Sequence, residues 1–326
     1  MLFTSLMDAM TTRRHAIQSM AGASAMVAGM AAMTADAATP KKGKHEPVDF
    51  KDPAQNLKAF IKVTGDLDPG KETVGWFGGT LYGVRGTEAL KPLVGVTGFG
   101  VLRVAPQGNN VYHLFNREFA VYTDLKSGEI IEEWTNPYSN EKVEVAPIKN
   151  AIVNAKVSPI IEQDFDGHKV TFPFTPPWIV QGDKAFSLFE LHAAFPNPMK
   201  VEQWPRESAG PLNRTSEMFQ RMTTMSQLEN PDITGADYVG AWTRVSPWLP
   251  WMLNGQMDGH ILYRCFMNRT GKAENLPKNL LAYAERKYPE FLKAPGPETW
   301  GKPNDSSFTV YMADRKPQPA KPAAAK

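Results

Sequence analysis

The sequence predicts a mainly β fold of the α+β class, with an antiparallel, barrel-like or strongly curved sheet and a few peripheral helices. Three observations support this prediction. Short runs rich in aromatic and β-branched residues recur along the chain, and turn-forming residues separate them. Glycines also lie inside these runs, as they do where a sheet bends or two backbones approach closely.

The first half of the chain is predicted to contain one helix followed by strands. Leu57, Phe60 and Ile61 have the spacing of a short amphipathic helix over residues 53–62. Strands are then expected in four segments: residues 74–84, 94–104, 119–123 and 130–134.

Two turns are predicted within this strand region. The last two strands should form a hairpin, because Asp124 can start the turn between them and Gly128 can end it. A second turn is expected over residues 136–140, where Asn, Pro and Ser are concentrated. Together these features predict an antiparallel meander.

The second half is predicted to mix strands with helices. Strands are expected within residues 157–174 and 185–192. Residues 216–228 are predicted to be helical because three methionines fall on one helical face, and residues 276–291 are predicted to form another, interrupted helix. The methionines are Met218, Met222 and Met225.

The first 38 residues are predicted to be a twin-arginine signal peptide. Arg13 and Arg14 precede a weakly apolar run over residues 16–33, and a small-residue cleavage site follows it. The alternative, a membrane anchor, fits the length of the run but not its low hydrophobicity. We therefore expect the twin-arginine export machinery as a partner and a periplasmic or extracellular location.

The remaining chain is predicted to contain one folded domain. Residues 39–50 form a Lys-rich linker, residues 51–314 a single β-rich domain, and residues 315–326 a disordered tail of Pro, Ala and Lys. No second segment is long and apolar enough to span a bilayer, so no stable membrane insertion of the mature protein is expected.

Composition narrows the classes of function. The net charge is +2, but residues 315–326 supply four positive charges, so the body of the chain is nearly neutral. This argues against nucleic-acid binding, which normally uses clustered Lys and Arg. The single cysteine, Cys265, excludes an internal disulfide and lies in an apolar run, which predicts a buried thiol. No metal-binding spacing, phosphate-binding loop or hydrolase elbow occurs, so no metal and no cofactor are expected.

Six short motifs stand out along the chain: 124–129 (DLKSGE), 134–138 (WTNPY), 195–198 (FPNP), 204–208 (WPRES), 242–252 (WTRVSPWLPWM) and 303–308 (PNDSSF). Together they resemble the domain-of-unknown-function family 1838. The resemblance extends over about residues 52 to 311 and implies a single domain, but it carries over no reaction.

Four tryptophans are the first candidates for a ligand site: Trp204, Trp242, Trp248 and Trp251. Indole rings have large rigid faces and one N–H donor, and they commonly line pockets for aromatic or polycyclic molecules. The alternative is that these rings only fill the core, because tryptophan is often buried for packing alone.

Charged residues next to these tryptophans are further candidates. Arg206 or Arg244 could hold a ligand carboxylate, with Glu207 as an acid, a base or an orienting partner. The alternative for each is a structural salt bridge that fixes a loop.

Three histidines are candidates for proton transfer because imidazole titrates near neutral pH. Strands are also expected over residues 111–119 and 259–267. On residues 186–192 and on these two strands, alternation places three pairs each on one face: Glu190 with His192, His113 with Arg117, and His260 with Arg264. The first pair forms an acid and a base only if its face points inward. Tyr263, beside the third pair, is a further candidate ligand contact.

Three functions remain open from the sequence. The first is a carrier whose aromatic-lined pocket binds a small apolar or aromatic molecule. The second is a cofactor-independent lyase, isomerase or hydrolase that uses the histidines and glutamates named above for acid–base chemistry. The third is a structural protein of the cell envelope.

Overall fold

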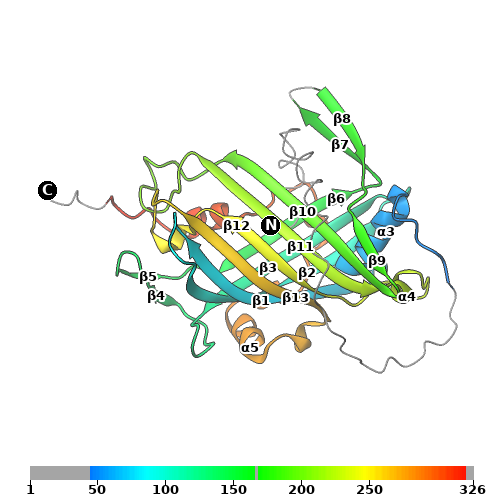
Figure 1. Cartoon of the computed structure of the whole chain (residues 1–326), viewed down its shortest axis with the longest axis horizontal. Coiled ribbons are helices and arrows are strands. Elements are labelled where there is room, and N and C mark those ends of the chain that lie inside the picture. Colours follow the sequence, from blue (N-terminus) through cyan, green and yellow to red (C-terminus); the bar gives the residue numbers. More distant parts are fainter. Residues whose placement is uncertain (1–44, 166–167, 321–326) are drawn as a thin grey trace.

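The computed structural model describes residues 45–165 and 168–320, and its main element is a nine-stranded antiparallel sheet that curves into a half-barrel (Figure 1). The strand order is β6-β3-β2-β1-β13-β12-β11-β10-β9, so pairing of β1 with β13 joins the two halves of the chain. The predicted mainly β class and the strongly curved antiparallel sheet are confirmed.

The main sheet consists of β1 Glu72–Val84, β2 Lys91–Pro106, β3 Tyr112–Thr123, β6 Ile148–Val157, β9 Trp178–Gln181, β10 Lys184–Pro196, β11 Leu212–Thr224, β12 Val239–Ser246 and β13 His260–Gly271. Two small hairpins consist of β4 Glu133–Thr135 with β5 Lys142–Glu144, and β7 Ile160–Phe165 with β8 His168–Pro173. The helices are α3 Pro53–Thr64, α4 Met225–Leu228, α5 Lys278–Lys287 and α6 Ser307–Asp314, with 3₁₀ turns η2 Pro250–Met252, η3 Ala273–Asn275, η4 Pro289–Leu292 and η5 Pro297–Thr299.

Helix α3 packs against the concave face of the half-barrel. It begins where the Asp52 side chain accepts hydrogen bonds from the backbone N–H groups of Ala54 and Gln55, both at 2.9 Å. Its apolar face is buried, and the ring of Phe60 lies 5.1 Å from that of Phe189 on β10. The helix therefore covers one end of the concave face, as its predicted amphipathic pattern requires.

The convex face is covered over β2 and β3 by α5 and η4. Phe119 on β3 packs against Tyr283 of α5 and Phe291 of η4, with ring centroids 6.4 and 5.6 Å apart. The sheet thus has an apolar layer on each face in this region. The cavity described below is lined mainly by the concave side, although Phe99 and Phe119 also border it.

The predicted helix over residues 216–228 is wrong. Residues 212–224 form strand β11, and only Met225–Leu228 is helical. The buried positions of β11 alternate strictly but include Glu217 and Arg221, so the inward face does not look apolar in the sequence. Methionine spacing therefore suggested a helical period that the backbone does not follow.

Most of the other predicted elements are confirmed. Helices α3 and α5 and strands β1, β2 and β10 occur where the sequence placed them. The predicted hairpin after β3 pairs only at its base, through a single bridge between Thr123 and Ile130. The turn over residues 136–140 joins β4 and β5, and Asn140 N–H donates to Asn136 O at 2.8 Å.

The ends of the described chain contact the domain. Phe50 stacks on Trp178 at 4.7 Å, and Gln318 N–H donates to Glu207 Oε1 at 2.7 Å. The predicted signal peptide and the last six residues of the predicted tail lie outside the described residues. Within the described part of the chain, no helix has the length and apolar character needed to cross a membrane.

Candidate functional site

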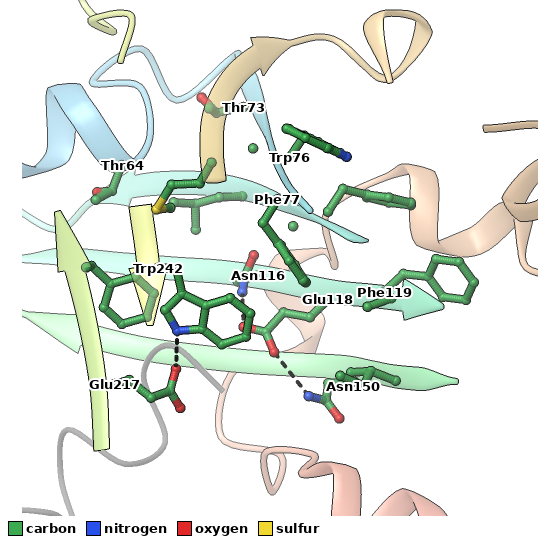
Figure 2. Close-up of a pocket in the computed structure, with 18 of the residues that line it drawn as sticks. Thr64, Thr73, Trp76, Phe77, Asn116, Glu118, Phe119, Asn150, Glu217 and Trp242 are labelled. Atoms are coloured by element: carbon green, nitrogen blue, oxygen red, sulfur yellow. Dashed lines mark hydrogen bonds between the residues drawn. The ribbon is translucent and has the colours of Figure 1, made fainter. Parts of the chain in front are cut away.

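A cavity of about 110 Å³ lies against the concave face of the sheet (Figure 2). Its wall is built from seven strands of the sheet, with Thr64 at the end of α3 and Ser307 at the start of α6 also contributing. The lining is mainly apolar and aromatic but includes four charged side chains: Glu118, Glu217, Arg221 and Arg244. A concave, mostly apolar space with a few polar groups is typical of a small-molecule site.

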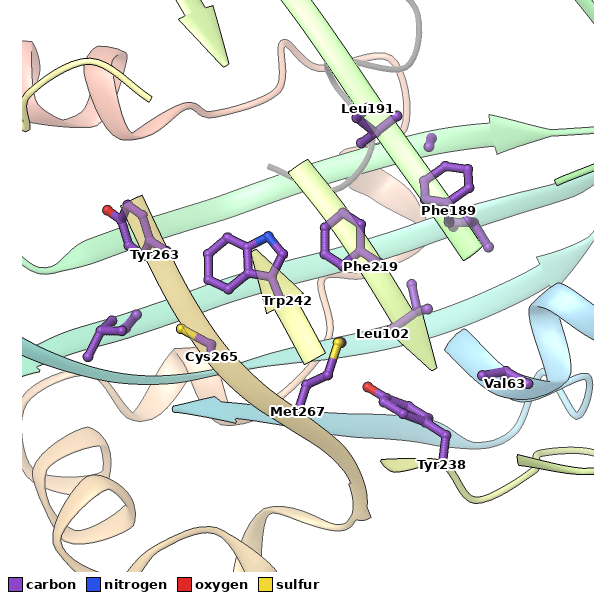
Figure 3. Close-up of a cluster of buried hydrophobic side chains, with 14 of the residues drawn as sticks. Val63, Leu102, Phe189, Leu191, Phe219, Tyr238, Trp242, Tyr263, Cys265 and Met267 are labelled. Carbon is purple, nitrogen blue, oxygen red and sulfur yellow. The ribbon is translucent and has the colours of Figure 1, made fainter. Parts of the chain in front are cut away.

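A row of aromatic rings runs across the concave face beside the cavity (Figure 3). Trp242 on β12 lies between Tyr263 on β13, at 5.4 Å, and Phe219 on β11, at 6.2 Å and nearly parallel. Phe77 on β1 meets Trp242 edge to face at 5.0 Å. Phe77, Phe219 and Trp242 therefore supply the cavity with rigid aromatic surface.

Two glycines leave space for the cavity. Gly75 on β1 pairs with Gly100 on β2, and Gly100 pairs with Glu118 on β3. Both glycines line the cavity, and a Cβ atom added to Gly100 would meet only Asn116 Oδ1 at 3.3 Å and one backbone oxygen at 3.8 Å. Larger residues here would project into the cavity, so the glycines keep this part of the wall open.

Glu118 is held at the cavity wall by two amides (Figure 2). Asn116 Nδ2 donates to Glu118 Oε1 at 3.2 Å, and Asn150 Nδ2 donates to Glu118 Oε2 at 3.1 Å. The register of β3 and β6 shifts between Asn116 and Glu118, which is a bulge-type irregularity. Such irregularities redirect side chains and are frequent beside functional sites.

Glu217, Trp242 and Arg244 form a second polar group in the cavity wall. Trp242 Nε1 donates to Glu217 Oε2 at 3.2 Å, and Arg244 Nε lies 3.8 Å from Glu217 Oε1. Glu217 and Arg244 are register partners on β11 and β12, and both are buried. The ion pair and the indole N–H partly compensate the cost of burying this carboxylate, although Glu217 Oε1 accepts no hydrogen bond within the described residues.

Arg221 is the third polar group and is 3% exposed. Its guanidinium carbon lies 5.0 Å from the ring centroid of Phe219 and 5.6 Å from that of Tyr238. Burial lowers the pKa of Arg221, and the neighbouring Tyr238 hydroxyl acts in the opposite direction. Arginine nevertheless stays protonated in proteins, so the cavity wall contains a buried positive charge.

Of the predicted site residues, only Trp242 and Arg244 line this cavity. Trp204 and its neighbours lie elsewhere: Trp204 packs in a small cluster with Met199 and Phe308. Arg206 Nη2 lies 2.6 Å from Glu141 Oε2, and Glu207 is buried beneath the chain end. Arg206 therefore forms a salt bridge with Glu141, which matches the structural alternative to ligand binding.

Trp248 and Trp251 fill the core. Trp248 is 2% exposed, and its Nε1 donates to Met257 O at 2.9 Å. Trp251 is 3% exposed and packs edge to face on Trp134 at 5.5 Å. Both rings match the packing alternative, because neither borders the cavity.

The three predicted same-face pairs do not point into the cavity. Glu190 and His192 do share a face, with Oε2 and Nε2 3.3 Å apart, but both side chains are about half exposed on the outside of β10. Glu190 and His192 were expected to act as an acid and a base only if their face pointed inward, and it points outward. His260 and Arg264 likewise alternate with the buried Ile261 on β13, and Arg264 is exposed.

His113 and Arg117 lie on the convex side of β3. His113 stacks on Trp300 at 3.4 Å, and both burial and nearby Lys156 lower its pKa. Arg117 Nε donates to Ala151 O at 3.1 Å. Tyr263 does lie on the concave face and is fully buried, but it contacts Trp242 rather than the cavity.

Sequence reasoning missed Glu118, Glu217 and Arg221. The available signal was alternation: each lies on a strand whose other inward positions are buried, so a polar residue at such a position marks a special site. On β3 the predicted pair, His113 with Arg117, has the opposite parity to Glu118. On β11 the methionine spacing predicted a helix, which conceals the alternation of Glu217 and Arg221.

No cluster of three or more His, Cys, Asp or Glu side chains suited to a metal occurs among the described residues. Cys265 is buried beside the aromatic row, as predicted, and burial raises the pKa of its thiol to about 12. The polar residues that line the cavity carry two carboxylates, two guanidinium groups, two side-chain amides and the hydroxyl groups of Thr64, Thr73, Tyr238 and Ser307.

A comparison with protein families identifies one match. Residues 70–314 match the model of the family described as a protein of unknown function, DUF1838. The chain belongs to this family. The match includes both cavity-lining halves of the sheet, so the DUF1838 domain contains the candidate site. None of the curated proteins matches the chain.

Proposed function

We propose that this DUF1838 protein binds a small, largely apolar molecule with a ring, in the cavity on the concave face of its sheet. The observation that carries the proposal is the cavity itself, about 110 Å³ in volume and lined by Phe77, Phe219 and Trp242. An apolar cavity of about 150 Å³ accommodates benzene, so the size fits a ligand with about one ring.

The arrangement of the wall supports binding over a purely structural role. Core positions usually carry apolar residues, whereas this wall places four charged side chains on inward positions of three strands: Glu118, Glu217, Arg221 and Arg244. Burying these charges opposes folding unless partners or ligands compensate. Ligand binding at the cavity accounts for the presence of these four charged side chains in its wall.

The acid–base alternative receives no support from histidines, because none borders the cavity among the described residues. Two carboxylates, Glu118 and Glu217, do border it. The binding experiment below therefore includes a search for product, and conversion of a bound compound would favour the enzyme over the carrier.

A cavity-filling variant tests the proposal. Single-ring aromatic and alicyclic compounds are titrated into the purified protein while tryptophan fluorescence is recorded, because Trp76 and Trp242 border the cavity. Gly100→Val adds bulk where only Asn116 is near, and Gly70→Val is the control because Gly70 is exposed outside the cavity.

We expect at least one compound to bind the wild type and the control equally. The same compound should lose about tenfold or more in affinity for Gly100→Val, because the ring and the valine compete for one space. Equal binding to all three proteins, with all three folded by circular dichroism, would contradict the proposed site.

We further propose that the protein acts in the periplasm or outside the cell after twin-arginine export. The support is the sequence of residues 1–38, with its paired arginines and small-residue cleavage site. Replacing Arg13 and Arg14 by Lys in a bacterial host should leave the precursor in the cytoplasm. Normal export of this variant would contradict the twin-arginine assignment.

A further inference from the structure

Arg221 has no acidic partner in its buried position. Its side chain is 3% exposed, its Nε and Nη1 have no hydrogen-bond acceptor, and no salt bridge to it forms within the described residues. Its neighbours are the rings of Phe219 and Tyr238. A buried guanidinium keeps its charge. Because Arg221 lines the cavity, the N–H groups at its Nε and Nη1 can donate to a ligand there.

Other largely buried arginines of the same chain are paired with carboxylates. Arg206 pairs with Glu141 at 2.6 Å, and Arg269 pairs with Asp66 at 3.1 Å. Arg244 has Glu217 at 3.8 Å. These three guanidinium groups each have a carboxylate nearby, whereas Arg221 has none among the described residues and borders a cavity where a ligand could supply the acceptor.

The neighbouring aromatic rings do not replace an anion. A ring face attracts a cation, but it accepts no strong hydrogen bond from the N–H groups at Nε and Nη1. The Tyr238 hydroxyl is one neutral acceptor and leaves the net charge in place. The site thus lacks one compact negative charge next to Arg221.

The rest of the wall limits which anion fits. Glu118 and Glu217 also border the cavity and would repel a group with two negative charges, such as a phosphate. A carboxylate carries one charge and accepts two parallel N–H bonds from one guanidinium. The volume of about 110 Å³ limits the whole ligand to about one ring with a small substituent.

From these observations we propose that the ligand is a small aromatic or alicyclic carboxylate whose anionic group is bound by Arg221. The inference rests on the proposed function, since it names the chemical class of molecule that the same cavity takes. The ring of the ligand lies against Phe219 and Trp242, and its carboxylate accepts hydrogen bonds from the guanidinium.

The test compares each carboxylate with its neutral amide. Benzoate and phenylacetate, and benzamide and phenylacetamide, are titrated calorimetrically at neutral pH into wild type, Arg221→Met and Arg214→Met. Methionine keeps the length of the side chain without the charge. Arg214 is the matched control, because it lies on the same strand with its side chain exposed on the other face.

We expect wild type and Arg214→Met to bind a carboxylate about tenfold or more tightly than its amide, which is the effect of a charge-assisted hydrogen bond. Arg221→Met should bind the two equally. The comparison within the wild type needs no variant, so a failure of Arg221→Met to fold does not remove the test.

Three outcomes would overturn the inference. Equal binding of carboxylate and amide to the wild type refutes the anion site but leaves the proposed cavity standing. A preference that persists in Arg221→Met, or disappears in Arg214→Met, assigns the selectivity to another group. Absence of binding of all four probes to the wild type counts against both the inference and the proposed single-ring ligand.

Discussion

Replacing Arg221 by Met should stabilise the unliganded protein, although it removes a residue that is almost fully buried. In most proteins, truncating a buried arginine destabilises the fold because a partner carboxylate is left alone. Arg221 has no such partner among the described residues, and its Nε and Nη1 lack acceptors. Removing it therefore removes an uncompensated charge.

The magnitude follows from the contacts of Arg221. An uncompensated buried charge costs about 3–5 kcal/mol. The variant loses ring contacts with Phe219 and Tyr238, at 5.0 and 5.6 Å. Those contacts contribute about 1–2 kcal/mol, and the interaction with the Tyr238 hydroxyl about 1 kcal/mol. The net expectation is a gain of about 1.5 kcal/mol in unfolding free energy, within a range of about 0–3 kcal/mol.

The assay is thermal and urea unfolding of the ligand-free protein, followed by circular dichroism. In a domain of this size, the expected gain raises the Tm by roughly 2–6 °C. Arg214→Met, an exposed control on the same strand, should change stability by less than about 0.5 kcal/mol. Destabilisation of Arg221→Met by about 1 kcal/mol or more would show that Arg221 is a structural group and refute the reasoning.

Three further predictions concern residues outside the cavity. Because burial raises the pKa of Cys265 to about 12, a thiol reagent at about pH 8 should label it only after unfolding, and rapid labelling of the native protein would contradict this. Burial and Lys156 lower the pKa of His113 below its ordinary 6.5, so its contribution to stability is complete above that pH and declines as the pH falls towards the folded pKa. His113→Phe should therefore reduce the loss of Tm between about pH 7.5 and 5.5, and an unchanged loss would count against it. His192→Ala should alter neither ligand binding nor stability by more than about 0.5 kcal/mol, because its ion pair is exposed, and a larger effect in titration or melting would require another role.

The fold was predictable where local pattern and burial agree. Helix α3 has an Asp52 cap and one apolar face, and both its existence and its start follow from the sequence. Strand β1 combines glycines with aromatic residues, and the structure pairs Gly75 with Gly100 in the sheet. In α3 and in β1, the local residue preferences and the pattern of burial therefore predict the same secondary structure.

The candidate site was harder to predict because it departs from the usual pattern. Strand β11 buries Glu217 and Arg221 at positions where a core strand normally carries apolar residues. The alternation of buried and exposed positions along β11 is therefore not visible as an alternation of apolar and polar residues. The methionine spacing then led to the prediction of a helix over residues 216–228. Glu118 was missed because the predicted pair on β3, His113 with Arg117, has the opposite parity. One of the two amides that hold Glu118, Asn150, also lies on β6, whose pairing with β3 is a tertiary contact.

Trp242 and Arg244 were predicted as site residues and do border the cavity, whereas Trp204, Trp248 and Trp251 do not. Residue type alone does not separate these cases, since an indole fills a core as readily as it lines a pocket. The difference lies in position on the half-barrel. Trp242 lies within a strand of the curved sheet, and Trp248 and Trp251 lie in and beside the turn that follows it.

A crystal structure of the wild-type protein with benzoate would test the central claim most directly. The account predicts electron density for the ring beside Phe219 and Trp242 on the concave face, with the carboxylate within hydrogen-bonding distance of Arg221. Benzoate bound only outside the cavity, with the space beside Arg221 filled by protein side chains, would contradict it.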